Sequence, residues 1–382
     1  MFTHYDFLRI IYRQHCNFHY PSHMRQTMAK TLGQLSGPIL ITGHTGFKGT
    51  WLTLLLESLD VNVAGYSLAP EPDSLFSRMN RTATVNERFA DIRDRHQFND
   101  FVKTVKPSAI IHMAAQPLVL DSYRIPLETF EINLMGSANI LDVAFANESV
   151  KVVIVVTTDK VYRNENFGKA FTESDPLSGK DPYSASKVAA EAAVSAWQQI
   201  ASVHGGPKII SVRAGNVIGG GDWGANRLFP DLIRNISKDK KFIVRNSSST
   251  RPWQHVLDPL VGYLYTLEAA IKGTDCKSIN FGPSTESFPV SRVIELAAKH
   301  WPHRTIIEFE QNNSNPTLEA TSLHLNSDFA RKILGWEPLW SQEAAVVSTM
   351  EWWDKVLNKA VSAQNACQED IEFVTNRDEL ST

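Results

Sequence analysis

The sequence has few cysteines and no paired-histidine motif. Its three cysteines, Cys16, Cys276 and Cys367, are far apart and lack CxxC spacing, which argues against a disulfide framework and a cysteine-type zinc site. This usage fits a reducing compartment, and we expect a cytoplasmic protein. The twelve histidines include no HExxH motif, so we predict no metal.

Long apolar runs and excess basic charge are also missing. A membrane helix needs roughly 20 apolar residues, whereas the longest pure runs are short, as at residues 152–156. Lysine and arginine number 38 against 41 acidic residues, and the net charge of −3 leaves no basic field for nucleic acid. At 382 residues, 43% of them hydrophobic, the chain is large enough for two lobes and a sizeable core.

The two ends of the chain differ from the rest. Residues 1–36 contain several histidines and arginines but only one acid, Asp6. One interpretation is a transit peptide, and the other is a disordered extension with Met24 or Met28 as later starts. We predict the disordered extension, and we assign residues 359–382 to a C-terminal tail.

Apolar segments of strand length alternate with helical patterns in the first half of the chain. They lie at residues 39–42, 61–66, 110–113, 150–156 and 209–212. Such alternation predicts an α/β fold with a doubly wound parallel (Rossmann) sheet. We assign residues 37–214 to this domain, with helix 257–272 packing back on it. Residues 215–256 and 273–358 are expected to form a second, smaller substrate-binding lobe.

A glycine-rich turn follows the first predicted strand. Gly43, Gly46 and Gly49 have GxxGxxG spacing, and residues 51–59 then show helical periodicity. Glycines allow a pyrophosphate to approach the backbone at the positive end of the helix. The turn therefore predicts dinucleotide binding, although the same glycines would also suit a purely structural helix entry.

Tyr183 and Lys187 are four residues apart in a predicted helix, and Asp181-Pro182 marks its start. The spacing places both side chains on one face, where an ammonium group lowers the pKa of a phenol and makes it a usable general base. Thr158 and Asp159 follow the very apolar segment 152–156, at the strand end where parallel sheets bind ligands. Both features point to one catalytic site.

Taken together, these motifs resemble the extended short-chain dehydrogenase/reductase family, and within it the nucleotide-sugar 4,6-dehydratases. The resemblance covers about residues 38–353. It rests on residues 42–49, 91–94, 112–119, 158–162, 181–187, 213–223 and 251–256. Lys160 and the last two segments resemble the subgroup that acts on CDP-glucose.

The resemblance implies a hydro-lyase that oxidises C4 of a hexose with bound NAD, eliminates water across C5 and C6, and returns the hydride to C6. Tyr183 would be the base, Lys187 its partner and a ribose ligand, and Thr158 a hydrogen-bond donor to the same oxygen. Asp159 would be the acid that protonates the 6-hydroxyl. Lys160 would act either as a base or as an electrostatic group, and its charge would oppose protonation of Asp159.

The resemblance also implies contacts to the cofactor and the substrate. The expected cofactor-binding residues, besides Tyr183 and Lys187, are Gly43, Thr45, Gly46, Phe47, Lys48, Gly49, Ser67, Asp91, Ile92, Ala114, Ala115 and Gln116. The second strand ends without the usual acid or an arginine, so NAD remains favoured over NADP with Ser67 as a polar contact. The expected substrate-binding residues are Gln116, Asn216, Arg227, Arg251 and His255.

Two other functions remain open from the sequence. A nucleotide-sugar 4-epimerase would share the fold, NAD, Tyr183 and Lys187 but would not need Asp159 and Lys160. A non-catalytic NAD(P)-sensing protein could dispense with Tyr183. Apolar residues surround much of the helix 181–203, which predicts a homo-oligomer, either a dimer or a tetramer.

Overall fold

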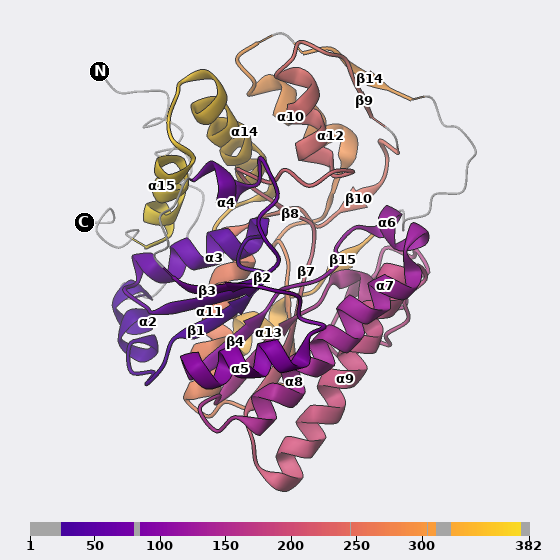
Figure 1. Ribbon diagram of the computed structural model, residues 1–382. Coiled ribbons are helices and arrows are strands. Elements are labelled where there is room, and N and C mark those ends of the chain that lie inside the picture. The colour runs from indigo at the N-terminus through magenta and orange to yellow at the C-terminus, as the bar shows by residue number, and fades with distance from the viewer. Residues whose placement is uncertain (1–23, 80–84, 245, 304, 311–321, 376–382) are drawn as a thin grey trace.

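The computed structural model describes residues 24–79, 85–244, 246–303, 305–310 and 322–375. A seven-stranded parallel sheet forms its centre, in the order β12-β7-β5-β4-β1-β2-β3 (Figure 1). The strands are β1 (Ile39–Thr42), β2 (Val63–Ser67), β3 (Asn86–Phe89), β4 (Ala109–His112), β5 (Val152–Val156), β7 (Lys208–Ala214) and β12 (Ser278–Phe281). This topology confirms the predicted doubly wound α/β fold.

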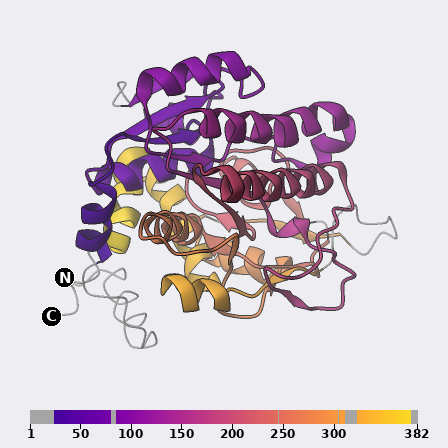
Figure 2. The ribbon, with the colours of Figure 1, turned by 90° about the horizontal axis from the view of Figure 1, so that it is seen from below.

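Helices cover both faces of the sheet (Figure 2). Apolar side chains of α5 (Arg95–Val105), α8 (Gly136–Ala146) and α9 (Pro182–His204) pack on one face with Leu40, Ile110 and Val153. Those of α3 (Phe47–Ser58) and α11 (Leu257–Ile271) pack on the other with Ile41 and Ile154. Successive strand residues thus face opposite helix layers, as expected of buried parallel strands.

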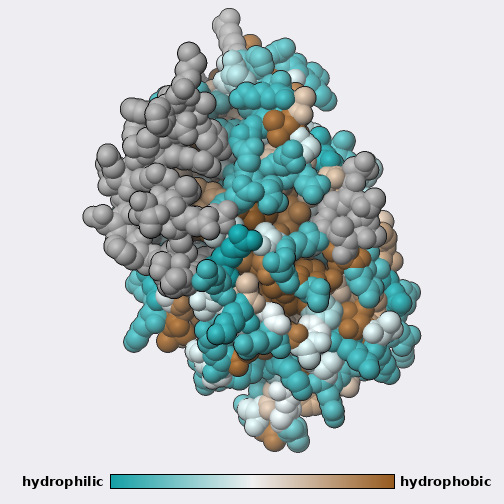
Figure 3. All heavy atoms as spheres, turned by 90° about the vertical axis from the view of Figure 1, so that its left-hand side faces the viewer, coloured by the Kyte–Doolittle hydropathy of each residue, from teal (hydrophilic) through white to brown (hydrophobic). Residues whose placement is uncertain are grey.

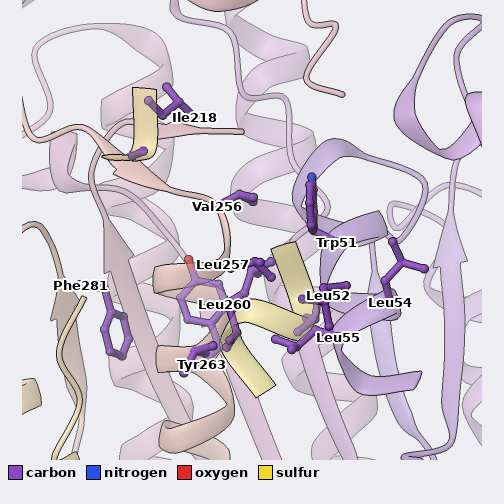
Figure 4. Packing of buried hydrophobic residues seen from close by; sticks show 14 of the residues in the cluster. Trp51, Leu52, Leu54, Leu55, Ile218, Val256, Leu257, Leu260, Tyr263 and Phe281 are labelled. Atoms are coloured by element: carbon purple, nitrogen blue, oxygen red, sulfur yellow. The ribbon is translucent and has the colours of Figure 1, made fainter. Parts of the chain in front are cut away.

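The contact between α3 and α11 joins distant parts of the chain. Leu52 and Leu55 of α3 and Leu257 and Leu260 of α11 lie in the same buried cluster (Figure 4). Each apolar side chain that is fully buried here contributes about 1.5–3 kcal/mol. This packing fixes the helix that follows the glycine turn against a helix from the C-terminal half of the chain.

The second lobe lies beyond one edge of the sheet layers, around α10 and α12 in Figure 1. Its elements are α10 (Leu228–Ile236), β9 (Phe242–Val244), β14 (Ile307–Phe309), α12 (Val290–Lys299) and α14 (Gln342–Asn358), with the short strands β8 (Val217–Ile218), β10 (Thr250–Arg251), β11 (Gln254–His255) and β13 (Phe288–Pro289). The remaining elements are α4 (Leu75–Arg78), α6 (Val119–Arg124), α7 (Pro126–Phe130), η1 (Glu131–Met135), η2 (Asp159–Val161), β6 (Ala170–Phe171), β15 (His324–Leu325) and α13 (Asp328–Leu334).

Both edge strands of the main sheet differ from the sequence prediction. Strand β12 lies inside the range 273–358 that we assigned to the second lobe, yet it pairs with β7 in the main sheet. Strand β3 was not predicted. Its residues are polar and partly exposed, and β12 mixes serine and asparagine with apolar residues, so neither has the apolar run that marked the central strands.

Helices form in both chain ends, in the extension 1–36 that we predicted to be disordered and in the tail 359–382. Residues 1–23 and 376–382 lie outside the described residues, but α2 (Met24–Leu32) buries Met28 and Leu32 in the core that contains α11. Helix α15 (Ala363–Thr375) buries Cys367 and Ile371 and packs on α3 and α14. On the face shown in Figure 3, which is the left-hand side of Figure 1, hydrophilic residues predominate around a central apolar area.

Helix α15 carries a carboxylate into this core. Asp370 Oδ2 lies 3.7 Å from His255 Nε2, and burial, opposed by the charge of Lys355, raises the pKa of Asp370 to about 7. Because the pKa rises above its ordinary value of 3.8, the carboxyl favours folding below pH 4, and this contribution is lost as the pH rises through 7.

Asp370→Asn should therefore stabilise the protein at pH 8 by roughly 2–4 kcal/mol, with a gain that shrinks towards pH 4. Urea unfolding across this pH range measures the effect. Glu369→Gln, which removes an exposed neighbouring carboxylate paired with Lys355, is the control and should change stability by less than about 1 kcal/mol. The raised pKa of Asp370 would be contradicted if the variant's gain in unfolding free energy over the wild type were no larger at pH 8 than at pH 4.

Candidate active site

The glycine turn connects β1 to α3 and approaches the end of β4. Gly43 has a φ of 76°, and a Cβ there would lie 2.8 Å from the backbone nitrogen of Ala114. A Cβ on Gly49 would lie 2.1 Å from the carbonyl oxygen of Gly43. Gly46 is the N-cap of α3 and provides no side-chain hydrogen bond to the helix amides. The first turn of α3 thus presents bare backbone, which suits a pyrophosphate.

The expected adenosine-side residues lie at the ends of β2 and β3. Thr45 Oγ1 is 2.7 Å from Ser67 Oγ, so the glycine turn is fastened to the end of β2. Asp91 accepts a charge-assisted hydrogen bond from Arg93 at 2.7 Å, which lowers the pKa of Asp91. Ile92 packs against Gly136. All these residues follow carboxyl ends of neighbouring parallel strands, where dinucleotides bind.

Ala114, Ala115 and Gln116 follow β4, but Gln116 has a structural use that the sequence did not indicate. Its Oε1 accepts from the nitrogen of Leu118 at 2.5 Å, and its Nε2 donates to the oxygen of Leu118 and to Thr129 Oγ1. The side-chain amide therefore holds its own loop together. The contact of Gln116 with cofactor or substrate stays a prediction, and the backbone of Ala114 lies beside the glycine turn.

Tyr183 and Lys187 lie in the first turns of α9, whose N-cap Asp181 accepts from the Ser184 nitrogen. Burial raises the pKa of Tyr183 to about 12, although a hydrogen bond with Thr158 and the charge of Arg227 lower it. Lys187 Nζ donates to the carbonyl oxygen of Val156 at 3.2 Å, and burial lowers the pKa of Lys187 to about 8. Thr158 and Arg227, rather than Lys187 as we expected, are thus the groups that lower the pKa of the phenol.

Thr158, Asp159 and Lys160 form the turn that leaves β5. Thr158 Oγ1 donates to Asp159 Oδ1 at 3.0 Å and also bonds Tyr183. Within the described part of the chain no hydrogen-bond partner reaches the buried Oδ2 of Asp159. Burial raises the pKa of Asp159 to about 6, even though the charge of Lys160 opposes this shift. Desolvation therefore outweighs the neighbouring ammonium that we expected to keep this carboxyl ionised.

Cations converge on this carboxyl and phenol. Lys48 is buried, donates to the hydroxyl of Tyr263 at 2.6 Å, and has a pKa lowered to about 7 by burial and by the charges of Lys187 and Arg227. Asp222 holds the Arg227 guanidinium at 3.0 Å and raises the pKa of Arg227. The sequence analysis did not single out Asp222, although it lies in the segment 213–223, and it missed Tyr263 because a tyrosine in an apolar helix carries no motif.

The other expected substrate residues do not all reach the site. The charge of Arg251 lies close enough to Asp159 to lower the pKa of Asp159. Asn216 precedes β8, and its carbonyl oxygen accepts a hydrogen bond from the Gln254 nitrogen. His255, in contrast, is fully buried, stacks on Trp340 at a ring-centroid distance of 4.2 Å, and faces α15. The prediction that His255 binds substrate is wrong, since its ring lies in the core.

Among the described residues, no group of three or more acidic, histidine or cysteine side chains could bind a metal. In the same part of the chain, no helix is long and apolar enough to cross a membrane. The site instead combines a buried acid, a phenol and several cations at the carboxyl ends of parallel strands. These groups can move protons and bind a polyanion.

Comparisons with known proteins agree with this arrangement. The NAD dependent epimerase/dehydratase family matches residues 39–282. A CDP-glucose 4,6-dehydratase of Salmonella typhimurium is 37% identical over 82% of this chain and 89% of its own. A UDP-glucose 4-epimerase of Halalkalibacterium halodurans is 26% identical over 86% of this chain and 98% of its own.

A solved structure shares the fold. It is a dTDP-glucose 4,6-dehydratase of Bacillus anthracis in complex with NAD, which superposes with a TM-score of 0.70 at 20% identity and covers 84% of this chain and 97% of its own. The family match spans both the glycine turn and the strand-end residues described above, and it confirms the resemblance in the sequence. The chain therefore belongs to the NAD dependent epimerase/dehydratase family.

Proposed function

We propose that this protein is a nucleotide-sugar 4,6-dehydratase that converts CDP-glucose to CDP-4-keto-6-deoxyglucose and water. The observation that carries the proposal is the buried Thr158, whose hydroxyl bonds both Tyr183 and Asp159. A base for oxidation at C4 and an acid for elimination at C6 would then act on one sugar ring. The identity to the Salmonella dehydratase supports the nucleotide assignment.

NAD is the cofactor of the proposed reaction, and the residues present fit it. Side chains at Gly43 and Gly49 would collide with backbone, which keeps the surface of the turn low enough for a pyrophosphate. Lys48 and Lys187 add positive charge, and Ser67 is the polar contact to the ribose. The turns after β3 and β4 flank the remainder of the dinucleotide. When bound, NAD would supply a hydride acceptor for oxidation at C4 of the sugar and a hydride donor for C6.

Tyr183 accepts the proton of the 4-hydroxyl while C4 is oxidised. Thr158, once its hydroxyl turns from Asp159 Oδ1, donates a hydrogen bond to the same oxygen, and Arg227 favours the phenolate by its charge. Lys187 lies one helical turn further along α9 and contributes a buried ammonium. Thr158 and Arg227 lower the pKa of the phenol against the larger effect of burial.

Asp159 supplies the proton for the leaving 6-hydroxyl. Its pKa of about 6 leaves a fraction of the carboxyl protonated near neutral pH, and its oxygen without a protein partner is the one placed to donate. Lys160 follows it directly and stabilises negative charge that develops on the sugar after oxidation. In the elimination the electron pair of the C5–H bond forms the C5–C6 double bond as the 6-hydroxyl leaves as water. The C5 proton passes to the neutral amine of Lys160, and the resulting ammonium stabilises the enolate.

Arg227, Arg251 and Asn216 are the substrate-binding residues in this proposal. The two guanidinium groups match a diphosphate in geometry and charge. Their closeness to Tyr183 and Asp159 puts the diphosphate next to the reacting sugar.

We propose further that the protein is a cytoplasmic homo-oligomer. Large apolar side chains of the segment α6–η1 are exposed: Leu120, Tyr123, Leu127 and Met135. Ile200 and Val203 of α9 are exposed as well. A second copy of the chain packing on these helices would bury them.

Incubation of the purified protein with CDP-, dTDP-, GDP- and UDP-glucose, without added reductant, tests the function. We expect a product from CDP-glucose that is lighter by one water, detected by mass spectrometry. Epimerisation, the activity of the Halalkalibacterium relative, would leave the mass unchanged. An enzyme that binds NAD but dehydrates none of the four sugars would refute the proposal.

A further inference from the structure

Three consecutive residues at the end of β5 contact four different partners. The Val156 carbonyl oxygen accepts from Lys187, Thr157 Oγ1 donates to Glu191 at 2.5 Å, and Thr158 bonds Tyr183 and Asp159. Thr157 therefore connects the chain segment that contacts the reacting groups to the carboxylate of Glu191. The proposed mechanism does not use this carboxylate. Glu191 lies on α9 at the spacing i+4 from Lys187 and i+8 from Tyr183, so all three share one helix face.

The Glu191 carboxylate is 6% exposed and accepts four hydrogen bonds. Thr157 Oγ1 and Arg213 Nε donate to one oxygen at 2.5 and 2.7 Å, while Ser211 Oγ and Arg213 Nη2 donate to the other at 2.8 Å each. Arg213 also donates to the hydroxyl of Tyr162. These bonds lower the pKa of Glu191 despite its burial, so the carboxylate is ionised at neutral pH.

Lys187 faces several charged or titratable groups. Lys48 approaches from α3 and His112 from the end of β4, and each has its pKa lowered by the charge of Lys187. Burial lowers the pKa of Lys187 itself, and the carboxylate of Glu191 raises it. Glu191 is thus the anion that favours the ammonium against burial and the neighbouring cation.

We propose that Glu191 is a positioning residue, which keeps Lys187 charged beside Tyr183 and fixes Thr157 so that Thr158 faces the reacting oxygen. The Arg213 guanidinium holds the carboxylate in place from β7. The catalytic role of Glu191 rests on the proposed function, whereas its effect on the charge of Lys187 can be tested in the protein without substrate.

Lys187 provides a direct readout without substrate. Its reactivity towards trace acetic anhydride, followed by peptide mass spectrometry across a pH series, reports the midpoint at which the amine becomes neutral. In Glu191→Gln we expect this midpoint to fall by about one pH unit or more, because a buried opposite charge is removed. The alkaline limb of the pH profile for the oxidation step alone, followed by the absorbance of reduced nicotinamide, should fall by the same shift.

The variant leaves Arg213 unpaired, and this cation alone could lower the midpoint or unfold the chain. Glu191→Gln combined with Arg213→Met removes both charges and keeps a similar volume. The proposal requires the downward shift of Lys187 to persist in this double variant. The proposal would be overturned if the midpoint of Lys187 returned to the wild-type value in the double variant. It would also be overturned if the midpoint did not move in a folded Glu191→Gln variant.

Glu268→Gln is the matched control. Glu268 is also 6% exposed, sits on α11, and pairs with Lys272 at 2.7 Å. Its removal should leave the midpoint of Lys187 and the pH profile of the oxidation step unchanged. If the wild type does not dehydrate CDP-glucose, the proposed function fails, whereas the labelling experiment still decides the role of Glu191.

Discussion

Replacement of Tyr183 by phenylalanine should slow oxidation of the sugar by about a thousandfold, within the range that general acid–base catalysis contributes. Phenylalanine retains the buried ring but removes the hydroxyl that bonds Thr158 and accepts the proton. Neither reduced nicotinamide, followed by its absorbance, nor keto sugar, followed by mass, should then accumulate at the wild-type rate. Binding of nucleotide sugar should change little.

Tyr123→Phe serves as the control, because it removes the same hydroxyl from a tyrosine that is 42% exposed on α6. It should retain full activity. A Tyr183→Phe enzyme that oxidises the sugar within tenfold of the wild-type rate would show that another group is the base. The neighbouring Tyr263, whose hydroxyl bonds Lys48, would then be the next residue to test.

Asp159→Asn should separate the two halves of the reaction. Asparagine fills the same space but has no acidic proton, so oxidation at C4 should continue while loss of water slows by about 10²- to 10⁴-fold. Reduced nicotinamide would accumulate in the variant, whereas in the wild type it is consumed within each turnover. Rapid-mixing absorbance and mass spectrometry of the quenched sugar distinguish the two steps.

The wild-type elimination step should also depend on pH. Because burial raises the pKa of Asp159 to about 6, the protonated acid declines above that value, and elimination should slow as the pH rises beyond it. The Asn variant should lose this dependence. Equal loss of oxidation in Asp159→Asn and Tyr183→Phe would refute the separate roles.

The central part of the fold could be predicted from the sequence because its signals are local. Five strands of the sheet contain short apolar runs, and the helix at 257–271 is mostly apolar, so burial on both sides was evident. The edge strands and the helix α15 were missed because polar residues make up much or most of each. The edge strands form through pairing with β2 and β7, and α15 is held by contacts with α3, which is about three hundred residues away.

The same distinction applies to the site. Residues with a motif, such as Gly43 or Tyr183, were identified because the chemistry requires a local spacing. His255 was misplaced because a motif segment can carry core residues as well as ligands, and only the packing of Trp340 and α15 shows which is which. The raised pKa of Asp159 likewise depends on burial, which adjacency to Lys160 in the sequence could not reveal.

The turn after β5 limits how this protein can be redesigned. Val156, Thr157 and Thr158 contact separate neighbours, so inserting or deleting one residue would shift each of them onto the wrong neighbour. Grafting a loop of another length from a related enzyme would therefore disable the catalyst together with its support. New substrate preferences are more accessible through point exchanges at Lys160 or at the arginines of the second lobe.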